Sequence, residues 1–138
     1  MAVASGQSEQ HLYSQSWYRV AGVKPRLRSH IRIQRQVFRE KEWYVLQDHS
    51  TGRFHRISPE AYFITGLMDG KRTMADIWDA AAVHLGDSLP TQEEIISLLS
   101  QIHRFDGLQS DLLPDMTELS ERNLREKRSK LLNYLASP

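Results

Sequence analysis

The chain has 138 residues, of which 40% are hydrophobic and 25% charged, and it contains no cysteine. A chain of this size and composition folds as one domain with tails. The lack of cysteine excludes disulfides, thiolate nucleophiles and cysteine zinc sites. Charge is uneven: residues 1–57 carry ten Lys and Arg against four Asp and Glu, and residues 58–138 carry eight against thirteen. The basic half would suit an acidic or anionic partner, or form a solvated strand face.

Hydrophobic alternation over residues 31–37 predicts a half-buried β-strand. Ile31, Ile33 and Val37 fall on one face with polar side chains between them, which is the period-two pattern of a strand with one buried face. We expect the chain to reverse in a tight turn at residues 40–41.

Two further strands are predicted close behind the first. Residues 43–46 are rich in aromatic and branched side chains that favour strands. Residues 53–57 form a short third strand after the turn-forming run 48–52. Because the three strands are consecutive, we expect them to pair in sequence order as an antiparallel meander.

Three helix-start signals come after the strands, since a hydroxyl residue precedes an acidic residue at each predicted first turn. The expected N-caps are Ser58, Thr73 and Thr91, and the expected terminating glycines are Gly70, Gly86 and Gly107. Strands followed by helices indicate an α+β fold. The predicted architecture is a three-stranded antiparallel meander followed by a three-helix bundle, which is winged-helix-like, plus a C-terminal helix.

The predicted organisation has three parts. Residues 1–28 form an N-terminal extension, residues 29–111 form the compact domain, and residues 112–138 form a C-terminal helix. Basic side chains gather in this last part at Arg122, Arg125, Lys127, Arg128 and Lys130. Apolar residues follow from Leu131, so we expect the helix to lead to a membrane span beyond this chain, with the basic cluster beside the membrane.

The titratable residues do not form a catalytic pattern. The six histidines include no pair spaced four apart, and the chain has neither a Gly-x-Ser-x-Gly elbow nor a glycine-rich phosphate loop. We therefore expect no catalysis, no cofactor and no metal site in this chain. Glu93 and Glu94 open the third predicted helix, where they would oppose phosphates, which argues against nucleic-acid binding.

A meander leaves its outer strands with unpaired N–H and C=O groups, and an extended peptide can pair with such an edge. A peptide on the third strand would lie near Arg53 and Arg56 and could rest against the third helix. The tails of the chain could equally cover this edge, and both arrangements stay open.

Three runs of residues carry a family resemblance. They are Phe54-His55-Arg56-Ile57-Ser58-Pro59-Glu60-Ala61-Tyr62, Leu67-Met68-Asp69-Gly70-Lys71-Arg72-Thr73 and Ile77-Trp78. Together they resemble the PqqD-like family of peptide-binding domains, also called precursor-peptide recognition elements. The resemblance spans about residues 29–111, and the Leu-x-Asp-Gly-x-Arg-Thr element is its most specific part.

The binding mode of that family implies which residues would meet a peptide. A leader peptide would pair with residues 53–57 and lie against the third helix. The implied peptide-binding residues are Arg53, Phe54, His55, Arg56, Ile57, Ile95 and Leu99. Leu98 and Ile102 on the same helix are expected to be core residues.

A second resemblance covers nearly the whole chain. It rests on Ser16-Trp17-Tyr18-Arg19, Pro25-Arg26-Leu27-Arg28, Trp43-Tyr44-Val45-Leu46-Gln47-Asp48 and Pro90-Thr91-Gln92. These runs are similar to the N-terminal region of bacterial membrane proteins identified as peptide zinc metalloproteases of the site-2-protease type. That similarity implies a place at the cytoplasmic face of the bacterial inner membrane. The family's His-Glu-x-x-His motif is absent, so any zinc would belong to a catalytic domain outside this chain.

The expected function is a non-catalytic peptide-recognition domain of a membrane-bound zinc metallopeptidase-like protein, which binds an extended peptide by β-strand addition. One alternative is an assembly scaffold for a secretion or membrane complex, acting through Trp17, Tyr18 and the C-terminal helix. Another is a winged-helix nucleic-acid binder. The expected partner is a peptide or protein, and the oligomeric state stays open.

Overall fold

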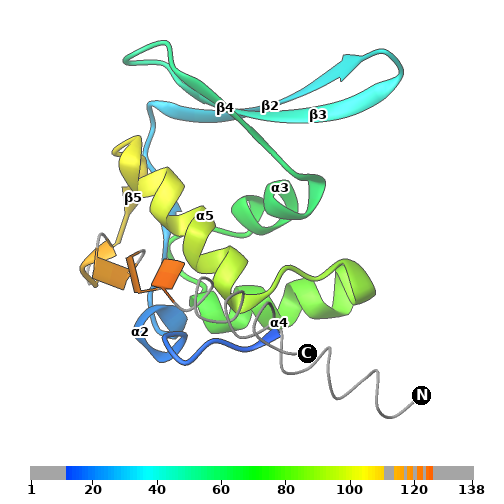
Figure 1. The fold of residues 1–138 in the computed structure, drawn as a ribbon. Helices are drawn as coiled ribbons and strands as arrows, with labels where there is room; N and C mark the ends of the chain where they lie inside the picture. Colours follow the sequence, from blue (N-terminus) through cyan, green and yellow to red (C-terminus); the bar gives the residue numbers. More distant parts are fainter. Residues whose placement is uncertain (1–11, 111–113, 117, 120, 123, 126–138) are drawn as a thin grey trace, which may run out of the picture.

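The computed structural model describes residues 12–110, 114–116, 118–119, 121–122 and 124–125. It mixes helices with a three-stranded sheet, and Figure 1 shows β2, β3 and β4 on one side of the molecule with α3, α4 and α5 on the other. The elements are α2 (Tyr18–Ala21), β1 (Arg26–Leu27), β2 (Ile31–Phe38), β3 (Lys41–Asp48), β4 (Phe54–Ile57), α3 (Pro59–Gly66), α4 (Met74–Leu85), η1 (Gly86–Ser88), α5 (Gln92–Arg104) and β5 (Leu108–Gln109).

The predicted meander is confirmed, because the strands pair antiparallel in the order β2-β3-β4. The β2–β3 turn consists of Arg39 and Glu40, whose φ angles are 52° and 66°. Two consecutive positive φ values are those of a type I′ turn, whose twist matches that of paired strands. The prediction of a turn at residues 40–41 is wrong by one residue, because Lys41 pairs with Phe38 and no Asn-Gly signal marks the turn.

The turn end of the β2–β3 hairpin extends past the helices (Figure 1). Ile31 at the opposite end of β2 is 5% exposed and Ile33 is half-buried, whereas Val37 is 64% exposed. The predicted burial of Val37 is therefore wrong, because the helices cover only the end of the sheet that contains Ile31.

The three predicted helix starts are confirmed. Ser58, Thr73 and Thr91 each accept a hydrogen bond from the backbone N–H three residues later, at 3.1 Å. The backbone N–H of Thr91 also donates to the Glu94 carboxylate at 3.0 Å, which completes a capping box. These local caps set where α3, α4 and α5 begin.

The N-terminal part of the chain joins the fold through short pairings. β1 pairs antiparallel with β5, and Arg26 also forms a β-bridge with Asp69. Since Asp69 takes part in this bridge, α3 ends before the predicted glycine at position 70. Val20 in α2 is 0% exposed, so the predicted N-terminal extension contributes to the core.

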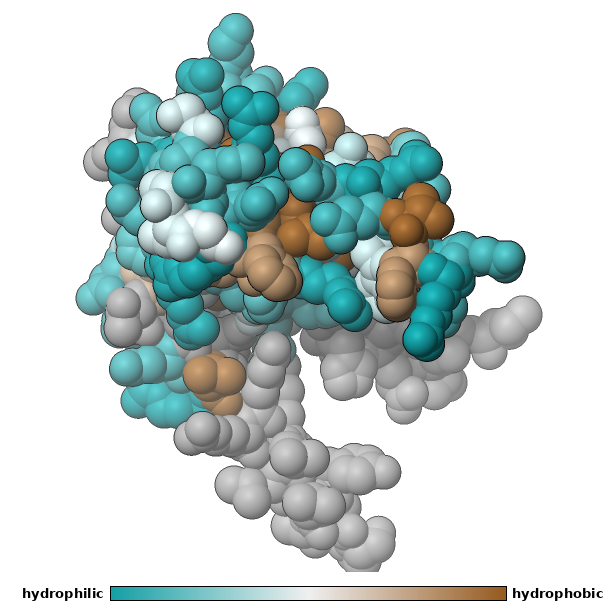
Figure 2. Space-filling view, turned by 90° about the horizontal axis from the view of Figure 1, so that it is seen from above, coloured by the Kyte–Doolittle hydropathy of each residue, from teal (hydrophilic) through white to brown (hydrophobic). Residues whose placement is uncertain are grey.

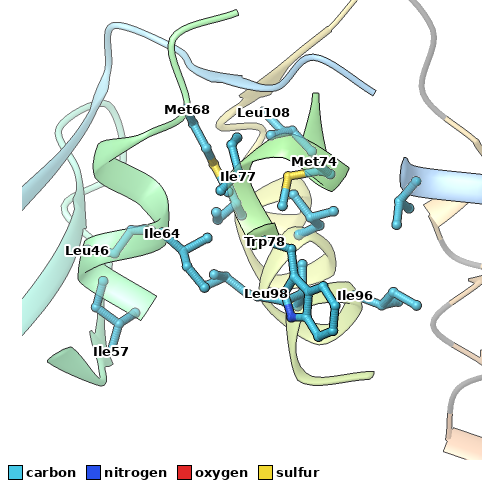
Figure 3. Packing of buried hydrophobic residues seen from close by; sticks show 14 of the residues in the cluster. Leu46, Ile57, Ile64, Met68, Met74, Ile77, Trp78, Ile96, Leu98 and Leu108 are labelled. Carbon is cyan, nitrogen blue, oxygen red and sulfur yellow. The ribbon is translucent and has the colours of Figure 1, made fainter. Parts of the chain in front are cut away.

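The core lies between the sheet and the helices. Figure 3 shows Leu46 and Ile57 from the sheet beside Ile64 of α3, with Trp78 and Leu98 from α4 and α5 beyond them. The largest fully buried side chains include Leu46, Ile64, Met74, Ile77, Ile95, Ile96, Leu99 and Ile102. Since α3 contacts both β3 and α4, it links the sheet to the other helices.

The described residues between Met116 and Arg125 are helical. Met116 and Leu119 are buried, and Glu118 forms ion pairs with Arg19 of α2 and with Arg122. The hydrogen bond from Arg19 holds the pKa of the Glu118 carboxyl below its usual range. These contacts tie the segment to the N-terminal part of the fold.

The predicted basic cluster is only partly described. Arg122 and Arg125 are exposed, while Lys127, Arg128 and Lys130 lie outside the described residues. Within the part of the chain that the structure describes, no helix is both long enough and apolar enough to cross a membrane.

Candidate functional site

The free edge of β4 is the first component of the site, because β4 pairs with β3 on one side and with no other described strand. The backbone N–H of Asp48 donates to the C=O of Arg53 at 2.8 Å. Hydrogen-bonded and non-hydrogen-bonded pairs alternate along an antiparallel ladder. The backbone groups of His55 and Ile57 therefore face β3, and those of Phe54 and Arg56 face the free edge.

A groove of about 440 Å³ runs between β4 and α5. Its apolar lining comes from the inner end of β4, from α3, from the loop before α5 and from α5 itself. These apolar residues are Ile57, Ala61, Leu89, Pro90, Ile95 and Leu98. Carboxylates of Glu60, Asp87 and Glu94 also line it, so the groove joins an apolar strip to acidic groups.

Two hydrogen-bond systems position the α5 side of this groove. The Trp78 indole N–H donates to the Pro90 carbonyl at 3.0 Å, which links α4 to the loop before α5. The Thr91–Glu94 capping box then fixes the first turn of α5. The groove wall is therefore held by contacts that do not involve β4, and a ligand could enter without breaking them.

The side chains of β4 alternate between the groove side and the opposite face of the sheet. His55 and Ile57 are paired with the buried Leu46 and Tyr44, so they lie on the helix side, whereas Phe54 and Arg56 lie on the other. We call this second face the outer face. Its strand residues are Arg32, Gln34, Gln36, Phe38, Lys41, Trp43, Val45, Gln47, Phe54 and Arg56.

The start of β4 is fixed by the buried carboxylate of Asp48, which is 1% exposed. It accepts hydrogen bonds from the Ser50 hydroxyl at 2.6 Å, the Ser50 N–H at 2.9 Å and the Thr51 hydroxyl at 2.9 Å. These bonds, led by that of the Ser50 hydroxyl, hold the pKa of Asp48 well below its usual range. The β3–β4 loop is therefore tied to the strand that precedes it.

Four of the seven predicted peptide-binding residues line the groove, namely His55, Arg56, Ile57 and Ile95. Phe54 lies on the outer face and is 74% exposed. Arg53 precedes β4, with its guanidinium 3.9 Å from the Asp48 carboxylate. Leu99 is 1% exposed and is not among the groove-lining residues, so its side chain serves the core. Leu98, expected only in the core, also lines the groove.

Sequence reasoning missed the residues that close the far end of the groove. Asp87, Leu89 and Pro90 belong to η1 and the loop before α5, and Glu60 belongs to the first turn of α3. They meet β4 only through the tertiary fold, so no local pattern marks them. The cap signal at Thr91 was visible, but it predicts a helix start and not a groove.

The described residues contain no group of three histidine, aspartate or glutamate side chains placed to hold a metal ion. The sequence matches no protein-family model and no curated protein.

Proposed function

We propose that this chain is a non-catalytic peptide-recognition domain in which an extended peptide adds to the free edge of β4. The observation that carries this proposal is the groove of about 440 Å³ that lies directly beside an edge strand. An edge strand supplies backbone hydrogen bonds that any sequence can make, and an adjoining groove supplies side-chain selectivity. Both components are needed for recognition, and both are present along β4.

The geometry of the edge sets how the peptide would be held. The N–H and C=O groups of Phe54 and Arg56 would bond to the peptide backbone, over a strand length of about 13 Å. Alternate peptide side chains would then enter the groove beside Ala61, Leu89 and Pro90, the apolar lining residues that are only half-buried. No residue of β2, the other edge strand of the sheet, lines this groove, so we assign the peptide to β4.

The wider proposal follows the family resemblance. A PqqD-like domain would have a winged-helix-like arrangement, with the meander set against a three-helix bundle. In the zinc metallopeptidase-like membrane proteins it would stand at the cytoplasmic face of the inner membrane, with Arg122 and Arg125 near the lipid. Catalysis and zinc would belong to another domain, and this domain would present the substrate or partner peptide.

The test replaces one edge-facing backbone donor. Arg56→Pro removes an N–H that points away from β3, so the sheet should remain paired while the added strand loses a bond. The matched variant Arg56→Ala removes the same side chain but keeps the N–H. Peptides selected from a random twelve-residue library against the full chain should bind Arg56→Pro at least about tenfold more weakly than Arg56→Ala.

Affinity would be measured by fluorescence anisotropy, with circular dichroism to verify that helix content is unchanged. Equal affinities for the two variants would contradict strand addition at β4. A library that yields no binding peptide would contradict the peptide-recognition function itself.

A further inference from the structure

The outer face carries a second hollow, of about 1220 Å³, on the side of the sheet turned away from the helices. Three aromatic side chains take part in it, Phe38, Trp43 and Phe54, one from each strand. Phe38 and Phe54 are 62% and 74% exposed. Figure 2 looks onto this side and shows separate apolar patches among hydrophilic residues. The face therefore offers several spaced apolar contacts, and not one continuous apolar surface.

Charge on the outer face has a single sign. The strand residues that point outward include Arg32, Lys41 and Arg56 but no aspartate or glutamate, whereas Glu42 and Asp48 occupy positions on the helix side. The Glu42 carboxylate is paired with Arg35 on that side, at 3.5 Å. No outward carboxylate on these strands offsets the outward cations, so the outer face is complementary to an anionic partner.

Two guanidinium groups at this face are held by aromatic rings. The guanidinium carbon of Arg56 lies over the Trp43 ring at 4.1 Å from the centroid, and that of Arg39 lies over the Phe38 ring at 5.3 Å. Neither arginine takes part in an ion pair among the described residues. A guanidinium that stacks through its plane keeps its N–H edge available for a carboxylate. The ring contacts thus fix where these two groups lie on the outer face.

We propose that the outer face binds an acidic protein segment that carries apolar side chains between its carboxylates. The carboxylates would meet Arg32, Lys41 and Arg56, and the apolar side chains would pack on Val45 and Phe54. Single-stranded nucleic acid is the less favoured partner, because stacking of successive bases needs several open ring faces. Of the three rings, those of Trp43 and Phe38 already carry guanidinium groups, which leaves Phe54 alone. This site is distinct from the groove, although β4 contributes to both.

The experiment uses the full chain labelled with ¹⁵N and two probes of twelve units, a peptide of alternating glutamate and phenylalanine and an oligouridylate. The expected result is that the peptide shifts the Trp43 indole signal and the side-chain amide signals of Gln34 and Gln36. Raising the salt concentration should strongly weaken the binding of the peptide, since exposed charges are screened.

Paired variants separate the outer face from general charge effects. Arg32→Gln with Lys41→Gln removes two outward charges and should weaken peptide binding about tenfold. Arg35→Gln removes a cation of the same strand from the helix side and should leave affinity within about twofold. Tighter oligouridylate binding at the same signals would overturn the proposal in favour of nucleic acid. Unshifted signals with both probes at low salt would overturn it altogether.

Discussion

Both faces of the three-stranded sheet carry apolar side chains, but these side chains are buried on one face and largely exposed on the other. On the helix side, Leu46 and Ile57 are 2% and 7% exposed, while Phe38 and Phe54 on the outer face are 62% and 74% exposed. The two faces differ in burial because the helices pack on one face only (Figure 1). The helix side thus contributes to the core, and the outer face leaves large apolar side chains exposed.

The sharpest test of this contrast uses adjacent residues of β3. Leu46→Ala removes a fully buried side chain and should lower the free energy of unfolding by about 2–5 kcal/mol, because it loses apolar burial and leaves a cavity. Val45→Ala on the outer face should cost less than about 1 kcal/mol. Urea denaturation followed by circular dichroism gives both values.

Equal losses for the two variants would show that the outer face is also packed, and the comparison between the faces would fail. A loss for Leu46→Ala below about 1 kcal/mol would place the core elsewhere.

The helices could be predicted closely because their start signals are local. Ser58, Thr73 and Thr91 are each recognisable with the residues that follow them, and each cap forms as expected. The two-residue strands β1 and β5 could not be predicted, since they are too short to show alternation and exist only because distant segments meet. The exposure of Val37 was missed for the same reason: alternation identifies a face, but helix packing decides whether that face is covered.

The residues of the candidate site also fall into those that the sequence could identify and those that it could not. His55, Arg56 and Ile57 could be named from the family resemblance, because the edge strand is continuous in sequence. The wall that includes Leu89 and Pro90 depends on how η1 and α5 approach β4, and nothing local in the sequence encodes that approach. Helical spacing alone does not decide whether Leu99 lines the groove or packs in the core, since side chains of both kinds lie on the same face of α5.

The second test concerns Asp48, at the end of β3 where the helix side is best covered. Asp48→Asn should lower the melting temperature near pH 7, because the buried carboxylate accepts several hydrogen bonds that an amide cannot all replace. The folded-state pKa is depressed, so the stabilisation is present above the unfolded-state pKa of about 3.9 and is lost as pH falls below it. The difference between wild type and variant should therefore shrink below about pH 4.

Thermal unfolding from pH 7 to pH 2.5 gives this profile. Ser88→Ala, in the exposed η1 segment, is a control that should leave the pH dependence unchanged. A difference between wild type and Asp48→Asn that stays constant down to the lowest pH would mean that the carboxylate is not the source of the stabilisation.

The smallest effect is expected at the hairpin turn, where the sheet extends past the helices and its geometry depends on the chain itself. Arg39 and Glu40 both adopt positive φ, which costs non-glycine residues about 1–2 kcal/mol each. Replacing them by Asn and Gly, the preferred type I′ pair, should raise the free energy of unfolding by about 1–2 kcal/mol in urea denaturation.

Replacing both by Ala removes the same side chains, including the guanidinium over Phe38, but keeps the strain, so it should give no gain. An equal gain from both double variants would trace the effect to side-chain loss and not to the turn, whereas a gain from Asn-Gly alone would mean that this uncovered end of the sheet is shaped by its backbone.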